Sequence, residues 1–355
     1  MNRKNICEIC TLIMGQSPDS KSYNKDKNGI PFYQGNADFG EEHPTPTVWC
    51  TAPKKIARKG DILISVRAPI GDMNIANEDC CIGRGLAAIR LNKSDIVDIN
   101  YLYHYLSATV EFLQEQGTGS TFKAINKTTL EGIEIPCPSI EKQKNIAKLI
   151  IEIKTSIQYK KAELFALNEL VKSRFIEMFG TLDLSIQGES WLPLSEISTI
   201  YTGTTPSTKE KENWDGKIPW ITPAELSEDS FFVFDSERKI TEKGLKSKSL
   251  SLMPKNTVLL STRAPIGKVA IAGIEMCCNQ GFKNFHCNNT ILNPIYLYTL
   301  LKNNNEYLNS LGTGTTFKEI SKTNVSKIKV PVANISLQNE FAEYVKLIDK
   351  SKFVG

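Results

Sequence analysis

Apolar residues recur along residues 146–178 at alternating steps of four and three. This heptad pattern predicts one long helix over residues 141–180 with a coiled-coil seam, ended at Gly180, where a left-handed cap suits glycine. Forty residues at roughly 1.5 Å each make a rod of about 60 Å, which can hold two domains apart. A long helix packed on its own domain remains the alternative. The seam positions are Ile146, Ile150, Ile153, Ile157, Lys160, Leu164, Leu167, Val171, Arg174 and Met178.

Short segments on both sides of this helix predict strands. Asp61–Val66 and Thr257–Ser261 alternate β-favouring and apolar residues, and an Arg-Ala-Pro-Ile-Gly turn follows each of them. Strands mixed with a few helices, without regular βαβ alternation, predict the α+β class, with mixed α/β domains. Return strands are expected at Met73–Ala76, Leu86–Leu91, Val269–Ala272 and Phe282–Cys287, and helices at Tyr101–Gln116 and Tyr296–Leu311.

The same motifs occur twice in the same order. Ser65-Val-Arg-Ala-Pro-Ile-Gly71 matches residues 261–267, and Gly117-Thr-Gly-Ser-Thr-Phe-Lys123 matches residues 312–318, at offsets of 196 and 195. Gly15-Gln-Ser-Pro18 matches Gly203-Thr-Thr-Pro206 at an offset of 188. The chain is therefore a tandem duplication. We expect a first domain at 1–140, the long helix at 141–180, a second domain at 181–335 and a second, shorter helix at 336–355.

The second helix continues the duplicated seam. Adding 195 to the first seam positions gives Phe341, Val345 and Ile348, after which the sequence ends at Gly355. If the two helices pair antiparallel, the second covers only the far half of the first and leaves Ile146 to Ile157 without that partner. A separate protein or a truncated gene would explain the difference.

Composition limits the remaining possibilities. The formal charge is +4, and residues 1–140 carry 15 basic and 16 acidic side chains, so any DNA contact depends on a local patch. The sequence shows no membrane-length apolar stretch and no signal peptide, which predicts a cytoplasmic protein without membrane contact. The paired cysteines Cys80-Cys81 and Cys277-Cys278 lie in apolar stretches, as expected of reduced, packed thiols.

With these motifs in order, the sequence resembles the specificity subunit of type I restriction-modification systems over essentially its whole length. The resemblance implies two tandem target-recognition domains with pseudo-twofold symmetry, separated by long helices that form an antiparallel coiled coil. It also implies that each domain reads one half of a split double-stranded DNA site. The helices would set the spacing and dock the methyltransferase subunits, two of them in our interpretation, with restriction subunits joining through the complex.

Several polar residues near the repeated turns are candidates for DNA contact. Arg67 and Arg263 occupy the same turn, where an arginine could hold a phosphate or a guanine edge, or could bond carbonyls of its own turn. Lys123 and Lys318 follow glycine-threonine loops suited to phosphate. Arg84 and its counterpart Gln280 differ between the copies, which favours a role in specificity. Gln16, Gln34, Asn36, Thr222 and Lys283 complete the set of candidates.

Other chemistry is not supported by the sequence. The glycine-rich loops lack the Gly-Lys-Ser/Thr of a nucleotide-binding loop, because phenylalanine precedes each lysine. Cys7 and Cys10 have metal-ligand spacing but no second pair, so we expect neither a metal nor a cofactor. No Asp/Asn-Pro-Pro-Tyr/Phe segment of an amino-methyltransferase is present. We therefore expect no catalytic residue and a non-enzymatic subunit. A stand-alone, pseudo-dimeric DNA-binding regulator is the alternative function, and nucleotide hydrolysis comes third.

Overall fold

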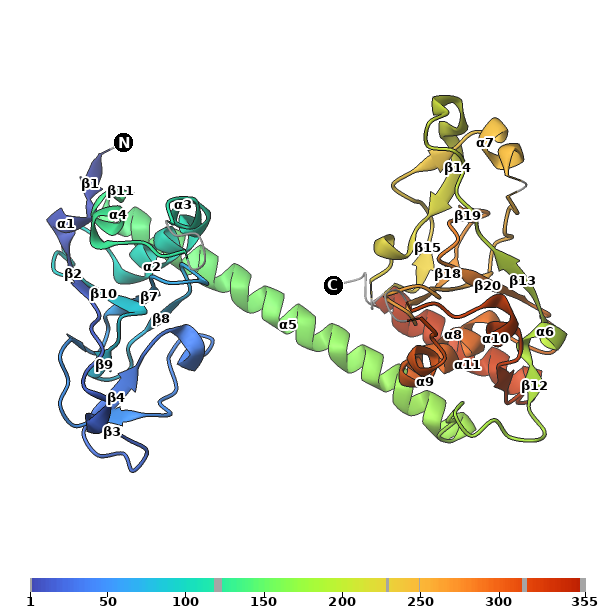
Figure 1. Ribbon diagram of the computed structural model, residues 1–355, viewed down its shortest axis with the longest axis horizontal. Helices are drawn as coiled ribbons and strands as arrows, with labels where there is room; N and C mark the ends of the chain where they lie inside the picture. Colours follow the sequence, from blue (N-terminus) through green and yellow to red (C-terminus); the bar gives the residue numbers. More distant parts are fainter. Residues whose placement is uncertain (1, 118–122, 228–229, 249, 315–317, 352–355) are drawn as a thin grey trace. The chain divides into compact units, whose positions relative to one another are not determined.

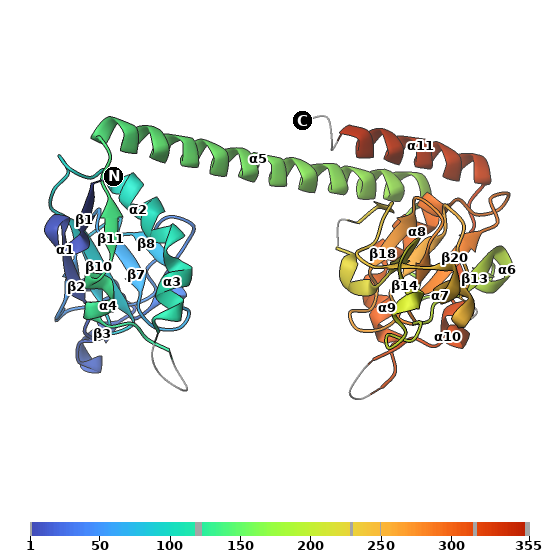
Figure 2. The ribbon, with the colours of Figure 1, turned by 90° about the horizontal axis from the view of Figure 1, so that it is seen from above.

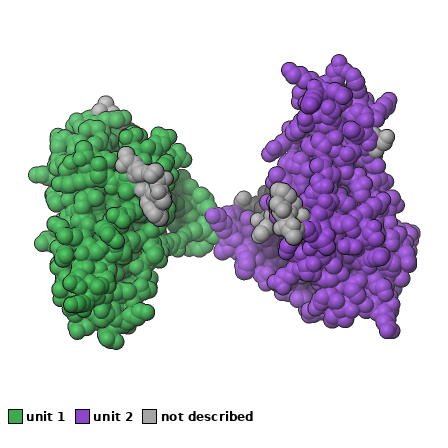
Figure 3. Space-filling view, in the orientation of Figure 1, with its two compact units in different colours: residues 1–159 green, residues 160–355 purple. Residues whose placement is uncertain are grey.

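The computed structural model describes residues 2–117, 123–227, 230–248, 250–314 and 318–351. The chain forms two compact units, residues 1–159 and 160–355 (Figure 3). Helix α5 (Ile140–Phe179) contributes its first half to unit 1 and its second half to unit 2. In both units strands and helices are mixed, which confirms the predicted α+β class. Within the described ranges, every helix is too short or too polar to cross a bilayer.

In its described residues, unit 1 combines three sheets, the smallest of which pairs β1 with β11, with a group of helices. Its helices besides α5 are α1 (Ile6–Ile9), α2 (Ile99–Ala108), α3 (Val110–Glu115) and α4 (Lys127–Glu131). Its strands are β1 (Arg3–Asn5), β2 (Cys10–Met14), β3 (Tyr23–Asn24), β4 (Ile30–Tyr33), β5 (Trp49–Cys50), β6 (Ile56–Ala57), β7 (Ile62–Ser65), β8 (Met73–Ile75), β9 (Cys80–Ile82), β10 (Leu86–Leu91) and β11 (Glu134–Pro136).

The antiparallel sheet β2-β10-β7-β8 lies in the middle of unit 1. Successive side chains of a strand point to opposite faces. Ile62 and Ile64 of β7 accordingly pack in the core that also contains Leu102 and Leu106 of α2, whereas Leu63 packs with Tyr33 and other residues of the second sheet. That second sheet has the order β3-β5-β4-β9-β6, and Figure 1 shows it at the end of the unit away from α2 and α3. Strand β7 is therefore apolar on both faces.

Unit 2 repeats this plan. Its strands are β12 (Leu192–Pro193), β13 (Ser198–Thr202), β14 (Trp214–Ile221), β15 (Phe232–Val233), β16 (Lys239–Ile240), β17 (Val258–Leu260), β18 (Val269–Ala272), β19 (Cys277–Cys278), β20 (Lys283–Cys287) and β21 (Lys329–Val330). Its helices are α6 (Leu194–Ile197), α7 (Glu242–Ser247), α8 (Pro294–Asn303), α9 (Asn305–Ser310), α10 (Lys322–Ser326) and α11 (Ile335–Ser351). The central sheet has the order β13-β20-β17-β18-β15, and β17 alternates as β7 does: Val258 and Leu260 face the helices, and Leu259 faces the other side.

The helices predicted at Tyr101–Gln116 and Tyr296–Leu311 are each broken into two. The first breaks at Thr109, whose backbone leaves the helical region and whose hydroxyl donates to Leu106 O at 2.8 Å. The second breaks at Asn304, whose side-chain nitrogen donates to the carbonyls of Leu300 and Leu182. Short polar side chains compete in this way for helix carbonyls, so the prediction of one uninterrupted helix in each copy was wrong.

The start of each long helix is fixed to its own unit by a buried glutamine. Gln143 donates to Ile96 O and Pro138 O, both at 2.8 Å, and accepts from Asp98 N at 3.0 Å. Gln338, which lies 195 positions later, makes the corresponding three bonds at the start of α11. Ile146 likewise packs against the core of unit 1. The first turns of α5 therefore use the seam to dock on their own domain.

The rest of the seam differs between the two halves of α5. In unit 2, α11 lies alongside α5 (Figure 2), with Phe341 against Phe175 and Glu340 bonded to Arg174 at 3.3 Å. In unit 1, Ile153 and Ile157 are 58% and 49% exposed. The other predicted seam residues range from buried to exposed. Val345 is buried, and Val171 and Met178 pack on the core of unit 2. Leu164 is exposed, and the half-buried ones are Ile150, Leu167 and Ile348.

Candidate nucleic-acid interface

Three of the predicted contact residues of unit 1 meet at the end of its central sheet. The backbone N–H of Gln16 donates to Ile82 O at 2.9 Å, and the side-chain oxygen of Gln34 accepts from Ser17 Oγ at 2.9 Å. The same Ser17 Oγ accepts from the backbone N–H of Arg84 at 3.4 Å. Gln16, Gln34 and Arg84 are all exposed. The fold thus brings three exposed residues, two with amide side chains and one with a guanidinium, to one meeting point of three loops.

Glycines permit this close approach of three loops. A Cβ on Gly15 would lie 2.1 Å from the carbonyl oxygen of Gly83, and one on Gly83 would lie 2.5 Å from Oε1 of Gln34. These separations are far below contact distance, so larger residues would push the loops apart. Gly15, the glycine of the repeated Gly-x-Ser/Thr-Pro motif, is therefore required for the packing of these loops.

The corresponding loops of unit 2 meet in the same way but with different side chains. The backbone N–H of Thr204 donates to Cys278 O at 3.1 Å, as Gln16 does to Ile82 in unit 1. Thr205 Oγ1 donates to Oε1 of Gln280 at 2.6 Å, whereas the matching Ser17 bonds Gln34. Thr222, at the position of Gln34, bonds Glu225 at 2.9 Å and caps a short turn. The backbone framework is shared, and the exposed chemistry differs.

The two arginine turns also differ in their surroundings. Both Arg67 and Arg263 are exposed, and the Ala-Pro bond after each is cis. Nε of Arg263 donates to Oε2 of Glu319 at 2.8 Å, while no acceptor among the described residues bonds the guanidinium of Arg67. The bonds to carbonyls of its own turn that the sequence left open are not seen for either arginine within the described ranges.

The remaining candidates differ in their exposure to solvent. Lys123 and Lys318 are exposed, next to the parts of the glycine-threonine loops, residues 118–122 and 315–317, that lie outside the described residues. Nδ2 of Asn36 donates to Oδ2 of Asp72 at 2.6 Å. Lys283 is buried and its Nζ lies 3.4 Å from Oε1 of Glu319. It therefore supports the surface rather than forming it.

Ser17, Thr205 and Glu319 were not among the residues predicted from the sequence. Ser17 and Thr205 lie within the repeated Gly-x-Ser/Thr-Pro motif, so the repeat itself contained the signal that both copies need a hydroxyl there. Glu319 follows Lys318 where the first copy has Ala124, and this difference between aligned positions was the available signal.

The described residues form no cluster of three or more histidine, cysteine or carboxylate side chains that could hold a metal ion. Burial raises the pKa of the Cys10 thiol to about 12, whereas Cys7 is exposed. Burial lowers the pKa of His104, and the nearby Lys154 lowers it further. His104 lies on α2, and its Nδ1 is 3.5 Å from Nζ of Lys154 in the first half of α5.

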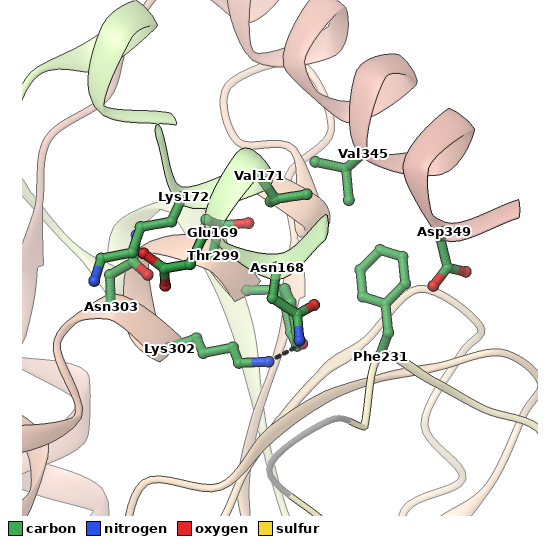
Figure 4. A pocket seen from close by; sticks show the side chains of 11 residues that line it. Asn168, Glu169, Val171, Lys172, Phe231, Thr299, Lys302, Asn303, Val345 and Asp349 are labelled. Carbon is green, nitrogen blue, oxygen red and sulfur yellow. Dashed lines mark hydrogen bonds between the residues drawn. The ribbon is translucent and has the colours of Figure 1, made fainter. Parts of the chain in front are cut away.

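Unit 2 also contains a pocket of about 140 Å³ where α5, α8 and α11 meet. Figure 4 shows Val171 and Val345 at the helix contact, with Phe231 across from them. Lysines and carboxylates are mixed around the opening, and Lys302 donates to the hydroxyl of Tyr298 at 3.2 Å. This mixture of opposite charges fits a junction between helices better than a site for a charged ligand.

Comparisons with known proteins match both copies. The family model described as the type I restriction modification DNA specificity domain matches residues 1–169 and 191–353. A specificity subunit assigned to the type I restriction enzyme MjaX of Methanocaldococcus jannaschii is 49% identical over 152 residues, covering 43% of this chain and 36% of that protein. The MjaIX specificity subunit of the same organism is 37% identical over 185 residues, covering 51% of this chain and 43% of that protein.

A solved structure matches almost the whole chain. The type I restriction-modification S subunit from M. genitalium superposes with a TM-score of 0.64 at 15% identity, covering 99% of this chain and 90% of that one. At this identity the likeness concerns the fold alone. The alignments with the two curated relatives span less than half of their length.

Proposed function

This chain belongs to the type I restriction-modification DNA specificity family, and we propose that it is the DNA-recognition subunit of such a complex. Each unit reads one half of a bipartite double-stranded site. Methyl transfer and cleavage are carried out by partner subunits, which this subunit directs to the sequence. The expected docking surface for methyltransferase subunits is the long helix α5 together with α11. The comparisons give no support to a stand-alone regulator.

The observation that supports this proposal is that the two units share the same backbone arrangement but expose different polar side chains on it. In both units a glycine, a hydroxyl residue and a loop after the Cys-Cys strand meet at one end of the central sheet. At this meeting point, unit 1 exposes Gln34 and Arg84, while unit 2 exposes Gln280. Because base pairs differ in the donors and acceptors at their groove edges, unlike polar groups on one framework suit two different half-sites. Phosphate contacts by Lys123 and Lys318, which occupy the same place in both copies, would position each unit without reading sequence.

Exchange of one unit tests this modular function. Residues 1–140 are replaced by the equivalent region of a family member with a different target, and the chimera is assembled with its methyltransferase subunits. Sequencing of the methylated DNA should show a change in one half of the site and none in the other, because each unit reads independently. The reciprocal exchange of residues 181–335 serves as the control and should change only the other half. A change in both halves, or in neither, would contradict the proposal.

A further inference from the structure

The turns that contain Arg67 and Arg263 are held by equivalent backbone hydrogen bonds in the two units. The N–H of Ile125 donates to Val66 O at 2.9 Å in unit 1, and the N–H of Ile320 donates to Thr262 O at 2.8 Å in unit 2. Arg67 consequently faces Ala124, and Arg263 faces Glu319, as isolated bridge partners. The same position of the repeat thus supplies the residue beside each arginine. That residue is alanine in unit 1 and glutamate in unit 2.

In unit 2 this position is Glu319, which belongs to a short network of charged side chains. Oε2 of Glu319 accepts from Nε of Arg263 at 2.8 Å, and Oε1 accepts from Nζ of Lys283 at 3.4 Å. Lys283 is held in turn by Thr262 Oγ1 and by the carbonyl oxygen of Gln280, each 3.4 Å from Nζ. The side chain of Lys283 is only 10% exposed, whereas that of Arg263 is 46% exposed. A buried lysine therefore supports a carboxylate, and the carboxylate holds an exposed arginine.

Unit 1 lacks both supporting residues. Ala87 stands where unit 2 has Lys283, since Ala87 follows Leu86, the partner of Ser65, just as Lys283 follows Phe282, the partner of Ser261. Ala124 replaces Glu319. Lys283 and Glu319 thus occur together in unit 2, and the aligned positions in unit 1 are both alanine. This indicates that the two residues act together.

We propose, on the basis of the proposed function, that Glu319 is a positioning residue that makes Arg263 a reader of guanine, while the unsupported Arg67 contacts phosphate. With Nε held, the two terminal nitrogens of Arg263 remain as an end-on fork, and no acceptor among the described residues bonds them. Such a fork matches O6 and N7 of guanine. Fixing the side chain beforehand reduces the conformational entropy lost on binding.

Lys283 explains how a carboxylate can lie at a surface that binds DNA. Its charge cancels that of Glu319, so the support adds no net negative charge near the phosphates. The same arrangement explains why an identical arginine in both copies does not imply an identical role. The orientation of a guanidinium decides whether it discriminates between bases, and that orientation is set by residues 283 and 319.

The decisive variant is Lys283→Ala/Glu319→Ala, tested in the full chain assembled with its methyltransferase subunits. It recreates the Ala87 and Ala124 arrangement of unit 1, which the fold already accommodates, and leaves no buried charge unpaired. Selection of bound sites from a random DNA library should show the guanine preference at one position of the second half-site reduced roughly tenfold or more. Arg263→Ala should lose the same preference, and combining all three changes should add no further loss.

Two further variants separate positioning from a general structural effect. Lys283→Met/Glu319→Gln removes the charges but keeps an acceptor for Nε, and it should retain the guanine preference. Arg67→Ala should weaken binding to all sequences alike and lower the slope of log K against log salt by about 1, as expected for a lost phosphate contact.

Retention of the full guanine preference by Lys283→Ala/Glu319→Ala, with loss of it in Arg263→Ala, would overturn the positioning role of Glu319. Equal weakening on every sequence by Arg263→Ala would overturn base reading by Arg263. Failure of the unaltered complex to select any bipartite site would instead overturn the proposed function, and this assignment with it. The unaltered complex therefore distinguishes the two failures.

Discussion

Asp61, which immediately precedes β7, and Arg90 of β10 form a two-point ion pair in unit 1. Nε of Arg90 donates to Oδ1 of Asp61 at 3.0 Å and Nη2 donates to Oδ2 at 2.7 Å, and the carboxylate is buried. The aligned positions in unit 2 are Thr257 and His286, whose Oγ1 and Nδ1 lie 3.3 Å apart. One site in the fold thus accepts either an ion pair or a threonine–histidine hydrogen bond.

We predict that Asp61→Ala lowers the free energy of unfolding of unit 1 by about 3 kcal/mol, because it removes the partner of Arg90, whose side chain is only 24% exposed. The matched control is Asp61→Thr/Arg90→His, which copies the pair of unit 2 and should lose less. Hydrogen exchange of the β7 and β10 amides in the full chain measures both changes. Equal protection of these amides in Asp61→Ala and in the unaltered chain would contradict the prediction.

Sequence reasoning located residues better than it located their surroundings. The alignment of Arg84 with Gln280 predicted a difference at an exposed loop, and both side chains are exposed there. Lys283 was grouped with the solvent-facing polar residues, yet it is buried. Lys283 aligns with Ala87, and an apolar residue at the aligned position was the available indication of burial. A lysine next to a turn is usually solvated, so this indication was outweighed. Its partner, Glu319, is distant in sequence, and only the fold brings the two together.

At the scale of helices and strands, the contact between α5 and α11 depends on a small aromatic cluster. Phe341 of α11 is fully buried, and its ring lies 5.3 Å from that of Phe175 and 5.7 Å from that of Phe179. Aromatic side chains buried in this way contribute strongly to packing. Further along α11, Leu347 is exposed although it is also apolar.

Phe341→Ala should therefore cost about 3–5 kcal/mol, the usual range for removing a buried phenylalanine. Calorimetry of the full chain should show the transition of unit 2 lowered by about 10 °C. Leu347→Ala is the matched control, since it removes an apolar side chain from the same helix at an exposed position, and it should leave the transition in place. A transition unaffected by Phe341→Ala would mean that α11 adds nothing to the stability of unit 2.

The elements followed the sequence pattern closely, with two informative differences. The heptad repeat predicted the long helix at 141–180, and α5 spans Ile140–Phe179. The pattern did not distinguish Ile146, which packs on its own domain, from Ile153, which faces solvent. Both uses need apolar residues at the same helical spacing, so periodicity alone cannot separate them. The breaks at Thr109 and Asn304 depend on side-chain bonds that periodicity does not report.

At the scale of the whole molecule, duplication explains why the sequence predicted so much. Two copies of each motif identified the turns, the strands and the start of both long helices before any contact was known. The differences between copies then indicated function, since a shared framework leaves the unlike residues as candidates for specificity. What duplication could not supply is the pairing of distant side chains, such as Ser17 with Gln34 in one copy and Thr205 with Gln280 in the other.

The exposed apolar residues of α5 in unit 1 lead to a prediction about assembly. Ile153 and Ile157 point into solvent one turn apart on the same helix. Solvent-facing apolar groups that recur at helical spacing are typical of a surface that a partner covers. Because both side chains are about half exposed among the described residues of unit 1, lysine at both positions should leave the stability of the chain unchanged. The same two changes should weaken association with the methyltransferase subunits, since each places a charge in an apolar contact.

We expect Ile153→Lys/Ile157→Lys to reduce that association at least about thirtyfold, as measured by titration of the purified chain with methyltransferase subunit. Ile186→Lys is the matched control, because Ile186 is 73% exposed but lies in the loop after α5, away from the seam. It should bind as the unaltered chain does. Equal affinity of the seam variant and this control would show that methyltransferase subunits dock elsewhere. Loss of affinity in the seam variant alone would instead identify this half of α5 as part of the docking surface and separate partner binding from the DNA-reading loops.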